Sequence, residues 1–215
     1  MEINRKQRGI LVVISGFSGS GKGTVIQSLL NRYESFYALS ISATTREPRN
    51  FEEDGREYFF KTKEEFEKMI AKDELIEYAL YVENYYGTPK EYVQNQLDAG
   101  KDVILEIEIQ GALKIKEMFP DTLLLFLTPK DAETLKERLV KRGTEQPEVI
   151  DARLLRASEE ALGVGAYDYL IINDTIEECV TEVHSVIQNE HRKVSRNEEF
   201  INRMKEELKS FSKGE

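Results

Sequence analysis

The sequence predicts an α/β fold in which helices cover both faces of a parallel sheet, forming three layers. Short apolar runs alternate along the chain with segments of helical periodicity, as parallel strands and their crossover helices do. A glycine loop with the spacing of a phosphate-binding loop, or P-loop, follows the first apolar run and opens a helix. The chain has 215 residues, of which 40% are hydrophobic, enough for one large core with inserted subdomains.

The predicted sheet begins with the apolar run 10–15, and the first predicted helix, 23–33, follows the glycine loop. The remaining strands are predicted at residues 37–41, 102–107, 122–127 and 168–172. The later core helices are predicted at residues 111–118, 131–142, 147–161 and 175–192. Pro147 suits the first turn of a helix, whereas Gly100 and Gly143 suit helix ends, so these residues agree with the predicted bounds.

The stretch 43–88 interrupts this alternation, because it is polar, rich in tyrosine and without a buried parallel strand. Residues 57–60 and 75–81 are predicted to be antiparallel strands. Between them, a capping box of Thr62 and Glu65 opens a short helix that carries its apolar residues on one side. We therefore expect an inserted mixed α/β lobe over the carboxyl edge of the sheet.

A second capping box, Thr88-Pro89-Lys90-Glu91, is expected to open a helix that returns the chain to the core. The expected domains are a core of residues 1–42 and 89–192 with a helical lid at about 131–153, an inserted lobe of residues 43–88, and an appended charged tail of residues 193–215. The tail carries apolar residues at helical spacing, namely Phe200, Ile201, Met204, Leu208 and Phe211. It is expected to form an amphipathic helix that packs on the body or joins copies of the chain into a homo-oligomer.

Composition limits the partners and the location of the protein. The net charge of −10 argues against non-specific binding to a nucleic-acid backbone. No apolar stretch approaches the ~20 residues that span a membrane, and the first residues lack the apolar centre of a signal peptide. Cys179 is the only cysteine, which excludes an intrachain disulfide, and its helical context predicts core packing. We expect a cytoplasmic enzyme without nucleic-acid or membrane partners.

The glycine loop predicts binding of nucleotide phosphates. Its backbone N–H groups can surround phosphate oxygens, and the following helix directs its positive end at the same anion. The expected binding residues are Gly16, Ser18, Gly19, Ser20, Gly21, Lys22, Gly23 and Thr24. Lys22 would reach the β- and γ-phosphates. Gly23 replaces the usual Ser or Thr, so the hydroxyl that contacts Mg²⁺ must come from Thr24, or the metal is held mainly through water.

The lobe supplies the residue types that a second nucleotide site needs. Arg46 and Arg49, together with tyrosine hydroxyls, form a cradle for a phosphate monoester. The carboxylate of Glu77 can accept hydrogen bonds from N1–H and the 2-amino group of guanine, which adenine does not offer side by side. Ser42 or Thr88 could donate a hydrogen bond to O6 of the base. The sequence therefore contains every element needed to bind GMP.

The chain resembles guanylate kinases, P-loop enzymes that phosphorylate GMP with ATP, from about Arg8 to about Gln188. The motifs that carry the resemblance are the Gly-Lys-Gly-Thr P-loop, Ser-Ala-Thr-Thr-Arg-x-Pro-Arg, Asn-Tyr-Tyr-Gly-Thr, Gln-Gly-Ala after an acidic strand, and Arg-Gly-Thr before an arginine-bearing helix. The resemblance implies that Ser42, Glu77 and Thr88 contact guanine with Glu108 close by, and that Arg46, Arg49, Tyr58 and Tyr86 bind the GMP phosphate. Glu106 and Glu108 stand where the family usually has at least one Asp, and Glu106 is a candidate for contact with hydrated Mg²⁺.

Three later arginines suit a lid over ATP. Arg138 and Arg142 are four residues apart and share a helix face, although a solvated charged helix is the alternative for this segment. In the resembled family this segment closes over ATP, and Asn173 lies in a loop similar to the family's adenine-side loop. Phosphoryl transfer develops negative charge that cations stabilise. The expected catalytic residues are Lys22, Arg46, Arg142 and Arg153.

The expected reaction is ATP and GMP giving ADP and GDP, with dGMP as a further acceptor. One alternative is a non-catalytic guanylate-kinase-like module that binds phosphopeptides, but such a module should have a degraded P-loop and lid. A second is a P-loop kinase for another acceptor, such as a phosphorylated sugar, which should lack the guanine-contacting set. A GTPase or motor protein is a third, and the absence of a switch-like motif disfavours it.

Overall fold

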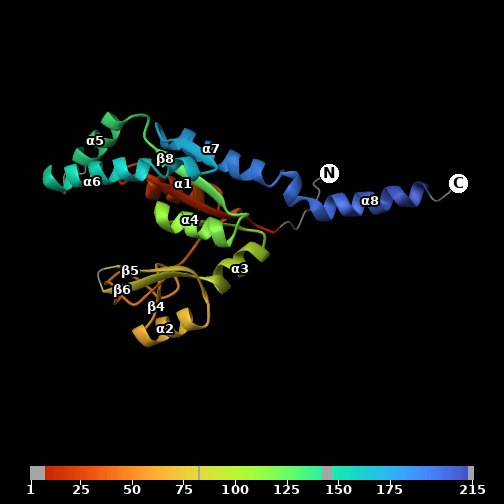
Figure 1. Ribbon diagram of the computed structural model, residues 1–215, viewed down its shortest axis with the longest axis horizontal. Coiled ribbons are helices and arrows are strands. Elements are labelled where there is room, and N and C mark those ends of the chain that lie inside the picture. The colour runs from red at the N-terminus through yellow and green to blue at the C-terminus, as the bar shows by residue number, and fades with distance from the viewer. Residues whose placement is uncertain (1–7, 82, 142–146, 213–215) are drawn as a thin grey trace.

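The computed structural model describes residues 8–81, 83–141 and 147–212. In these residues the predicted α/β fold is confirmed, with a five-stranded parallel sheet in the order β2-β7-β1-β8-β9 (Figure 1). The strands are β1 (Leu11–Gly16), β2 (Tyr37–Leu39), β7 (Asp102–Glu106), β8 (Leu123–Thr128) and β9 (Tyr169–Ile172). Each coincides with a predicted strand to within two residues at either end.

Alternating residues of the central strands face two separate core layers. On one face, Val12 and Ile14 pack with α1 (Lys22–Arg32) and α7 (Ile176–Glu190). On the other face, Leu11 and Val13 pack with α3 (Lys90–Asp98) and α4 (Ile109–Met118). This period of two is that of a strand buried on both sides. Cys179 is buried in the first layer, as predicted, and burial raises the pKa of its thiol to about 11.

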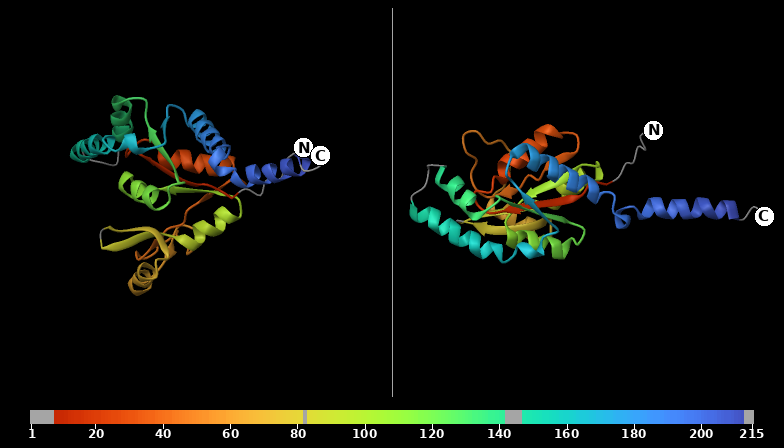
Figure 2. Two further views of the ribbon diagram at one scale, coloured as in Figure 1. Left: turned by 45° about the vertical axis from the view of Figure 1, so that its right-hand side comes forward. Right: turned by 90° about the horizontal axis from the view of Figure 1, so that it is seen from above.

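The inserted stretch forms a second sheet with its own small core, apart from the five-stranded sheet (Figures 1 and 2). The strand order is β4-β3-β6-β5. The elements are β3 (Ala43–Thr44), β4 (Phe59–Phe60), α2 (Lys63–Ala71), β5 (Leu75–Tyr81) and β6 (Asn84–Pro89). The buried residues of this core are Ala43, Phe66 and Leu75, with Met69 and Ile70 packed against them.

The Thr62–Glu65 capping box predicted in the lobe is confirmed in both of its hydrogen bonds. Three other details of the lobe differ from the predictions. β4 pairs parallel with β3, so the predicted antiparallel strand at 57–60 is wrong in direction, and β6 was not predicted as a strand. The capping box predicted at Thr88 is also wrong, because Pro89 stands at the N-cap of α3 and the Thr88 hydroxyl donates to Glu77 across the sheet.

Two helices lie beside the P-loop, where the lid was expected. They are α5 (Ala132–Lys141) and α6 (Pro147–Ala161). Their buried residues Leu135, Leu139 and Ala157 pack together and against Phe17 of the P-loop. Arg142 and Gly143 lie outside the described residues.

The tail forms the predicted helix, α8 (Glu198–Ser212), which runs away from the body (Figures 1 and 2). It has no buried residue, so the expected packing on the body is not observed. Among the described residues, no helix combines the length and apolar character needed to cross a membrane.

Candidate functional site

The P-loop has a backbone that only glycine adopts easily. Gly19 and Gly21 have φ angles of 93° and 90°, in the left-handed region. A Cβ atom at Gly21 would also lie 2.6 Å from Nδ2 of Asn173. Gly21 stands at the N-cap of α1 and makes no side-chain cap hydrogen bond to the first amides of the helix. The loop therefore presents backbone donors at a positive helix end, the arrangement that binds phosphate.

Lys22 folds over this loop. Its ammonium group donates to the carbonyl of Gly16 at 2.6 Å and lies 3.4 Å from that of Phe17. These carbonyls keep the cation at the mouth of the loop, beside the first amides of α1. A phosphate bound to the loop would meet Lys22 without a large movement of its backbone.

Two predicted ATP-binding residues brace the P-loop from the neighbouring segments. Asn173, just after β9, donates its side-chain amide to the carbonyl of Ser20 at 2.8 Å. Arg138 of α5 donates to the same carbonyl at 3.2 Å and to the backbone of Asn173 at 2.7 Å. The hydroxyl of Ser20 is buried and has no hydrogen-bond partner in the described part of the chain. These contacts fix the far wall of the P-loop.

Arg153 reaches the P-loop from α6, where its guanidinium donates to the hydroxyl of Ser18 at 2.7 Å. Arg142, its predicted companion, cannot be placed. Thr24 and Glu106, the predicted metal contacts, are both exposed, and Glu106 ends β7 in register with Ile14 of β1. No group of three or more acidic, histidine or cysteine side chains in the described residues could hold a metal by itself.

The predicted phosphate cradle is assembled on the lobe around Arg46. Its guanidinium lies 5.4 Å from the ring centre of Tyr58 and is only 18% exposed. The ring of Tyr86 stacks edge-on against that of Tyr58, with ring centres 6.0 Å apart. Both oxygens of Glu52 lie 2.8 Å from the same nitrogen of Arg46. This carboxylate occupies the guanidinium that the cradle is proposed to offer to a phosphate.

Glu52 is the site residue that the sequence analysis missed. It also accepts the backbone N–H of Arg49 at 2.8 Å, and that bond, with Arg46, lowers the pKa of its carboxyl. The side chain of Arg49 is exposed. Spacing was the one sequence signal for Glu52, which follows Arg46 and Arg49 at the same interval of three residues. Several acidic residues follow in the same turn, so there was no reason in the sequence to select Glu52 among them.

The predicted guanine-contacting residues lie on neighbouring strands of the lobe. The buried hydroxyl of Thr88 on β6 donates to the carboxylate of Glu77 on β5 at 2.8 Å. Burial raises the pKa of Glu77, while the Thr88 hydrogen bond and the charge of Lys114 oppose that shift. Ser42 is half-buried at the start of β3, where its carbonyl accepts the N–H of Phe59.

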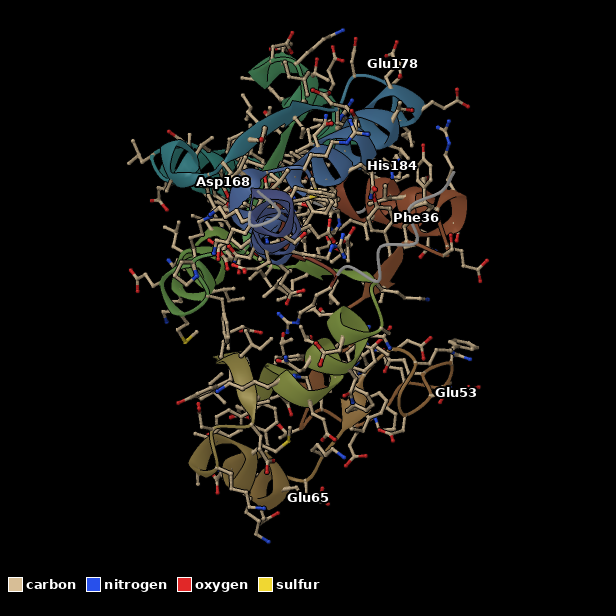
Figure 3. All side chains as sticks on the ribbon, turned by 90° about the vertical axis from the view of Figure 1, so that its right-hand side faces the viewer. Phe36, Glu53, Glu65, Asp168, Glu178 and His184 are labelled. Atoms are coloured by element: carbon tan, nitrogen blue, oxygen red, sulfur yellow. The ribbon has the colours of Figure 1, made fainter. Side chains whose placement is uncertain are left out.

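Glu108, expected near the base, has a partner outside this set. It is exposed at the start of α4 and forms an ion pair with Arg156 of α6, which also pairs with Glu160 at 3.1 Å. The site is thus divided between two bodies. Figure 3 shows the lobe, which carries Glu53 and Glu65, set apart from the core that carries Asp168 and His184.

Comparison with known proteins gives a consistent result. A family model described as guanylate kinase matches residues 8–190. The chain is 47% identical over 202 residues to a guanylate kinase of Caldanaerobacter subterraneus subsp. tengcongensis, covering 94% of this chain and 98% of that protein. It is 50% identical over 191 residues to one of Lactococcus lactis, covering 89% and 93%. The crystal structure of guanylate kinase from Anaplasma phagocytophilum matches with a TM-score of 0.68 and 31% identity, over 88% of this chain and 90% of that one.

Proposed function

The chain belongs to the guanylate kinase family, and we propose that it transfers the terminal phosphoryl group of ATP to GMP, giving ADP and GDP. The observation that carries this proposal is the Glu77–Thr88 pair on the lobe, placed beside the Arg46 cradle and in the same molecule as a complete P-loop. A carboxylate positioned by a hydroxyl matches the paired N–H donors of guanine. The non-catalytic alternative is not favoured, because Lys22 and Arg153 are both in place at the P-loop.

On the GMP side, the phosphate replaces Glu52 as the partner of Arg46, with Tyr58, Tyr86 and Arg49 completing the cradle. The guanidinium fork suits two phosphate oxygens as it suits two carboxylate oxygens. Ser42, Glu77 and Thr88 contact the base. Glu108, which the resemblance places near the base, is paired with Arg156 here.

On the ATP side, the P-loop amides and Lys22 bind the β- and γ-phosphates. Arg138 and Asn173 support the P-loop through their hydrogen bonds to the carbonyl of Ser20. Mg²⁺ is the proposed metal. Thr24 and Glu106 suit it, because Mg²⁺ keeps several waters and takes few protein oxygens when phosphates supply the others. When bound, the metal neutralises phosphate charge.

Catalysis then consists of positioning and charge stabilisation, since a phosphate oxygen of GMP is already a nucleophile. Lys22, Arg46, Arg142 and Arg153 neutralise the charge that develops on the transferred group. The lobe must close toward the P-loop so that the two phosphates meet in line. Small-angle scattering should show a smaller radius of gyration with GMP and a non-hydrolysable ATP analogue together than without them, and unchanged dimensions would refute closure.

A coupled ADP-release assay with GMP, dGMP, AMP, CMP and UMP as acceptors tests the function. We expect turnover with GMP, weaker or equal turnover with dGMP, and little with the other three. If the protein turned over none of these acceptors but bound a phosphopeptide, the non-catalytic module would be favoured instead. A cytoplasmic location remains our expectation, in keeping with the proposed substrates.

A further inference from the structure

Helix α8 presents an apolar seam that the single chain does not cover. The exposed fractions of Met204, Leu208 and Phe211 are 38%, 59% and 81%, so exposure rises with distance from the body. The helix lies beyond residue 190, where the family match ends. Its role is therefore separate from the proposed phosphoryl transfer.

The joint that precedes α8 has a definite structure, so the helix leaves the body in a fixed direction. The buried carboxylate of Glu190 pairs with Lys193 at 2.8 Å and Arg196 at 3.1 Å. Arg196 also donates to the carbonyl of Asp121. The side-chain amide of Asn197 donates to the carbonyls of His191 and Lys193, both at 2.8 Å. A buried, paired carboxylate at this point is unusual for a frayed tail.

The apolar residues of α8 follow a heptad pattern. Ile201, Met204, Leu208 and Phe211 occupy successive a, d, a and d positions. Nearly all other positions of the helix are charged or polar. A helix of this length is only marginally stable alone in water, because most helical stability comes from packing an apolar face. The seam therefore calls for a partner.

We propose that α8 pairs in parallel with α8 of a second copy of this chain, about a two-fold axis. Charge decides both the partner and the direction. The helix carries four acidic and three basic residues, which does not suit an anionic membrane or nucleic acid. An antiparallel pair with its apolar residues matched would set Lys205 against Lys205 and Glu207 against Glu207 of the second copy, and a parallel pair avoids both repulsions.

Parallel pairing also brings the bases of the two helices together. Exposed apolar residues lie in that region, with Val194 at 74%, Met118 at 53% and Phe119 at 37% exposure. Two heptads bury less area than a stable dimer needs, so these residues are available to extend the interface. We expect a concentration-dependent dimer.

Sedimentation analysis of the full chain, from micromolar to millimolar concentration, tests the pairing. The mass should rise from that of the 24.8 kDa monomer toward twice that value. Leu208→Glu should keep the chain monomeric, because it places like charges in the seam. Ser210→Glu is the matched control, since it adds the same charge on an outward-facing position and should still dimerise. A wild-type monomer at every concentration, or a dimer that survives Leu208→Glu, would overturn the proposal.

Cross-linking tests the direction. In the parallel pair the two Ile201 positions face each other, so Ile201→Cys should form a disulfide-linked dimer on mild oxidation. In the antiparallel pair they lie about 15 Å apart along the helix, too far for a disulfide. Cys179 is buried and should not interfere. Failure to cross-link in a chain that still dimerises would overturn the parallel arrangement. Guanylate kinase activity should be unchanged in Leu208→Glu, so neither result bears on the proposed reaction.

Discussion

The two halves of the candidate site differ in how they are attached to the core. The P-loop lies between β1 and α1 and is tied by Asn173, Arg138 and Arg153 to three other segments of the core. The GMP cradle lies on a separate sheet with its own small core. Ile76 is the buried residue of the lobe that packs in the α3–α4 layer.

The difference indicates that one half is preformed and the other is completed by its ligand. The P-loop already has its glycine conformation and holds Lys22 over its own backbone, so the proposed binding of ATP should require little rearrangement. Arg46 is instead neutralised by Glu52 of its own lobe. In the proposed reaction GMP displaces that carboxylate, and the lobe then approaches the P-loop. Variants in the two halves should therefore affect different kinetic parameters.

The largest effect should come from the preformed half. Lys22→Ala removes the cation proposed to contact the ATP phosphates and not GMP, so kcat should fall by about 10³-fold. The dissociation constant for GMP, measured by calorimetry, should remain near the wild-type value. Wild-type turnover in this variant would contradict the P-loop assignment, and a parallel loss of GMP affinity would contradict the independence of the two halves.

Glu77→Gln should produce the next largest effect, on the GMP half alone. An amide cannot accept from both guanine donors, and its own NH₂ group faces one of them. The loss should be roughly 2–4 kcal/mol in GMP binding. Calorimetry with GMP measures it, and titration with an ATP analogue serves as the control. Unchanged GMP affinity would mean that Glu77 does not contact the base.

Arg46→Lys and Arg49→Lys compare the contributions to GMP binding of a largely buried arginine and an exposed arginine of the cradle. Lysine keeps the charge but loses the planar fork, so neither variant should restore full activity. Arg46→Lys should raise the KM for GMP by about 10-fold or more, because this side chain is enclosed by Tyr58 and Glu52. Arg49→Lys should have a smaller effect. If both variants titrate GMP like the wild type, the cradle assignment is wrong.

Local patterns predicted most of the fold, and the failures occurred in the lobe, where strand direction and side-chain partners depend on which segments pair. Apolar runs located all five core strands, because burial on both faces leaves little ambiguity. Thr88 had the spacing of a helix cap, but its hydroxyl donates to Glu77 on the neighbouring strand. That contact depends on the pairing of β5 with β6, which spacing along the chain does not reveal.

The same limit applies to site residues. Glu52 was missed because its role depends on the fold of the loop that brings it to Arg46. Glu108 follows a core strand at the expected place, and its carboxylate pairs with Arg156, a partner that spacing along the chain does not reveal. Motifs therefore select candidate residues, whereas the separation of the two halves is visible only in three dimensions.

The smallest expected effect concerns the pH dependence of GMP binding. Burial raises the pKa of Glu77 above the ordinary value of 4.5, and the Thr88 hydroxyl partly offsets this shift. The ionised form accepts the guanine donors, so GMP affinity should fall as the pH drops through that raised pKa. A carboxyl group whose pKa is raised by folding stabilises the folded state at low pH, and that stability is lost as the pH rises through the raised pKa. Protonation of Glu77 in acid therefore does not unfold the protein, and unfolding does not explain the loss of GMP affinity.

Thr88→Val sharpens this test. Removing the hydroxyl deletes a hydrogen bond to the charged form, so the pKa of Glu77 should rise further. GMP affinity will also fall at every pH if Thr88 contacts the base, so the readout is the midpoint of the pH profile. Ser42→Ala is the matched control, because Ser42 is also proposed to contact guanine but is not hydrogen-bonded to Glu77. Equal midpoints in all three proteins, with circular dichroism showing intact folds, would mean that the Glu77–Thr88 pair does not set the charge of the guanine site.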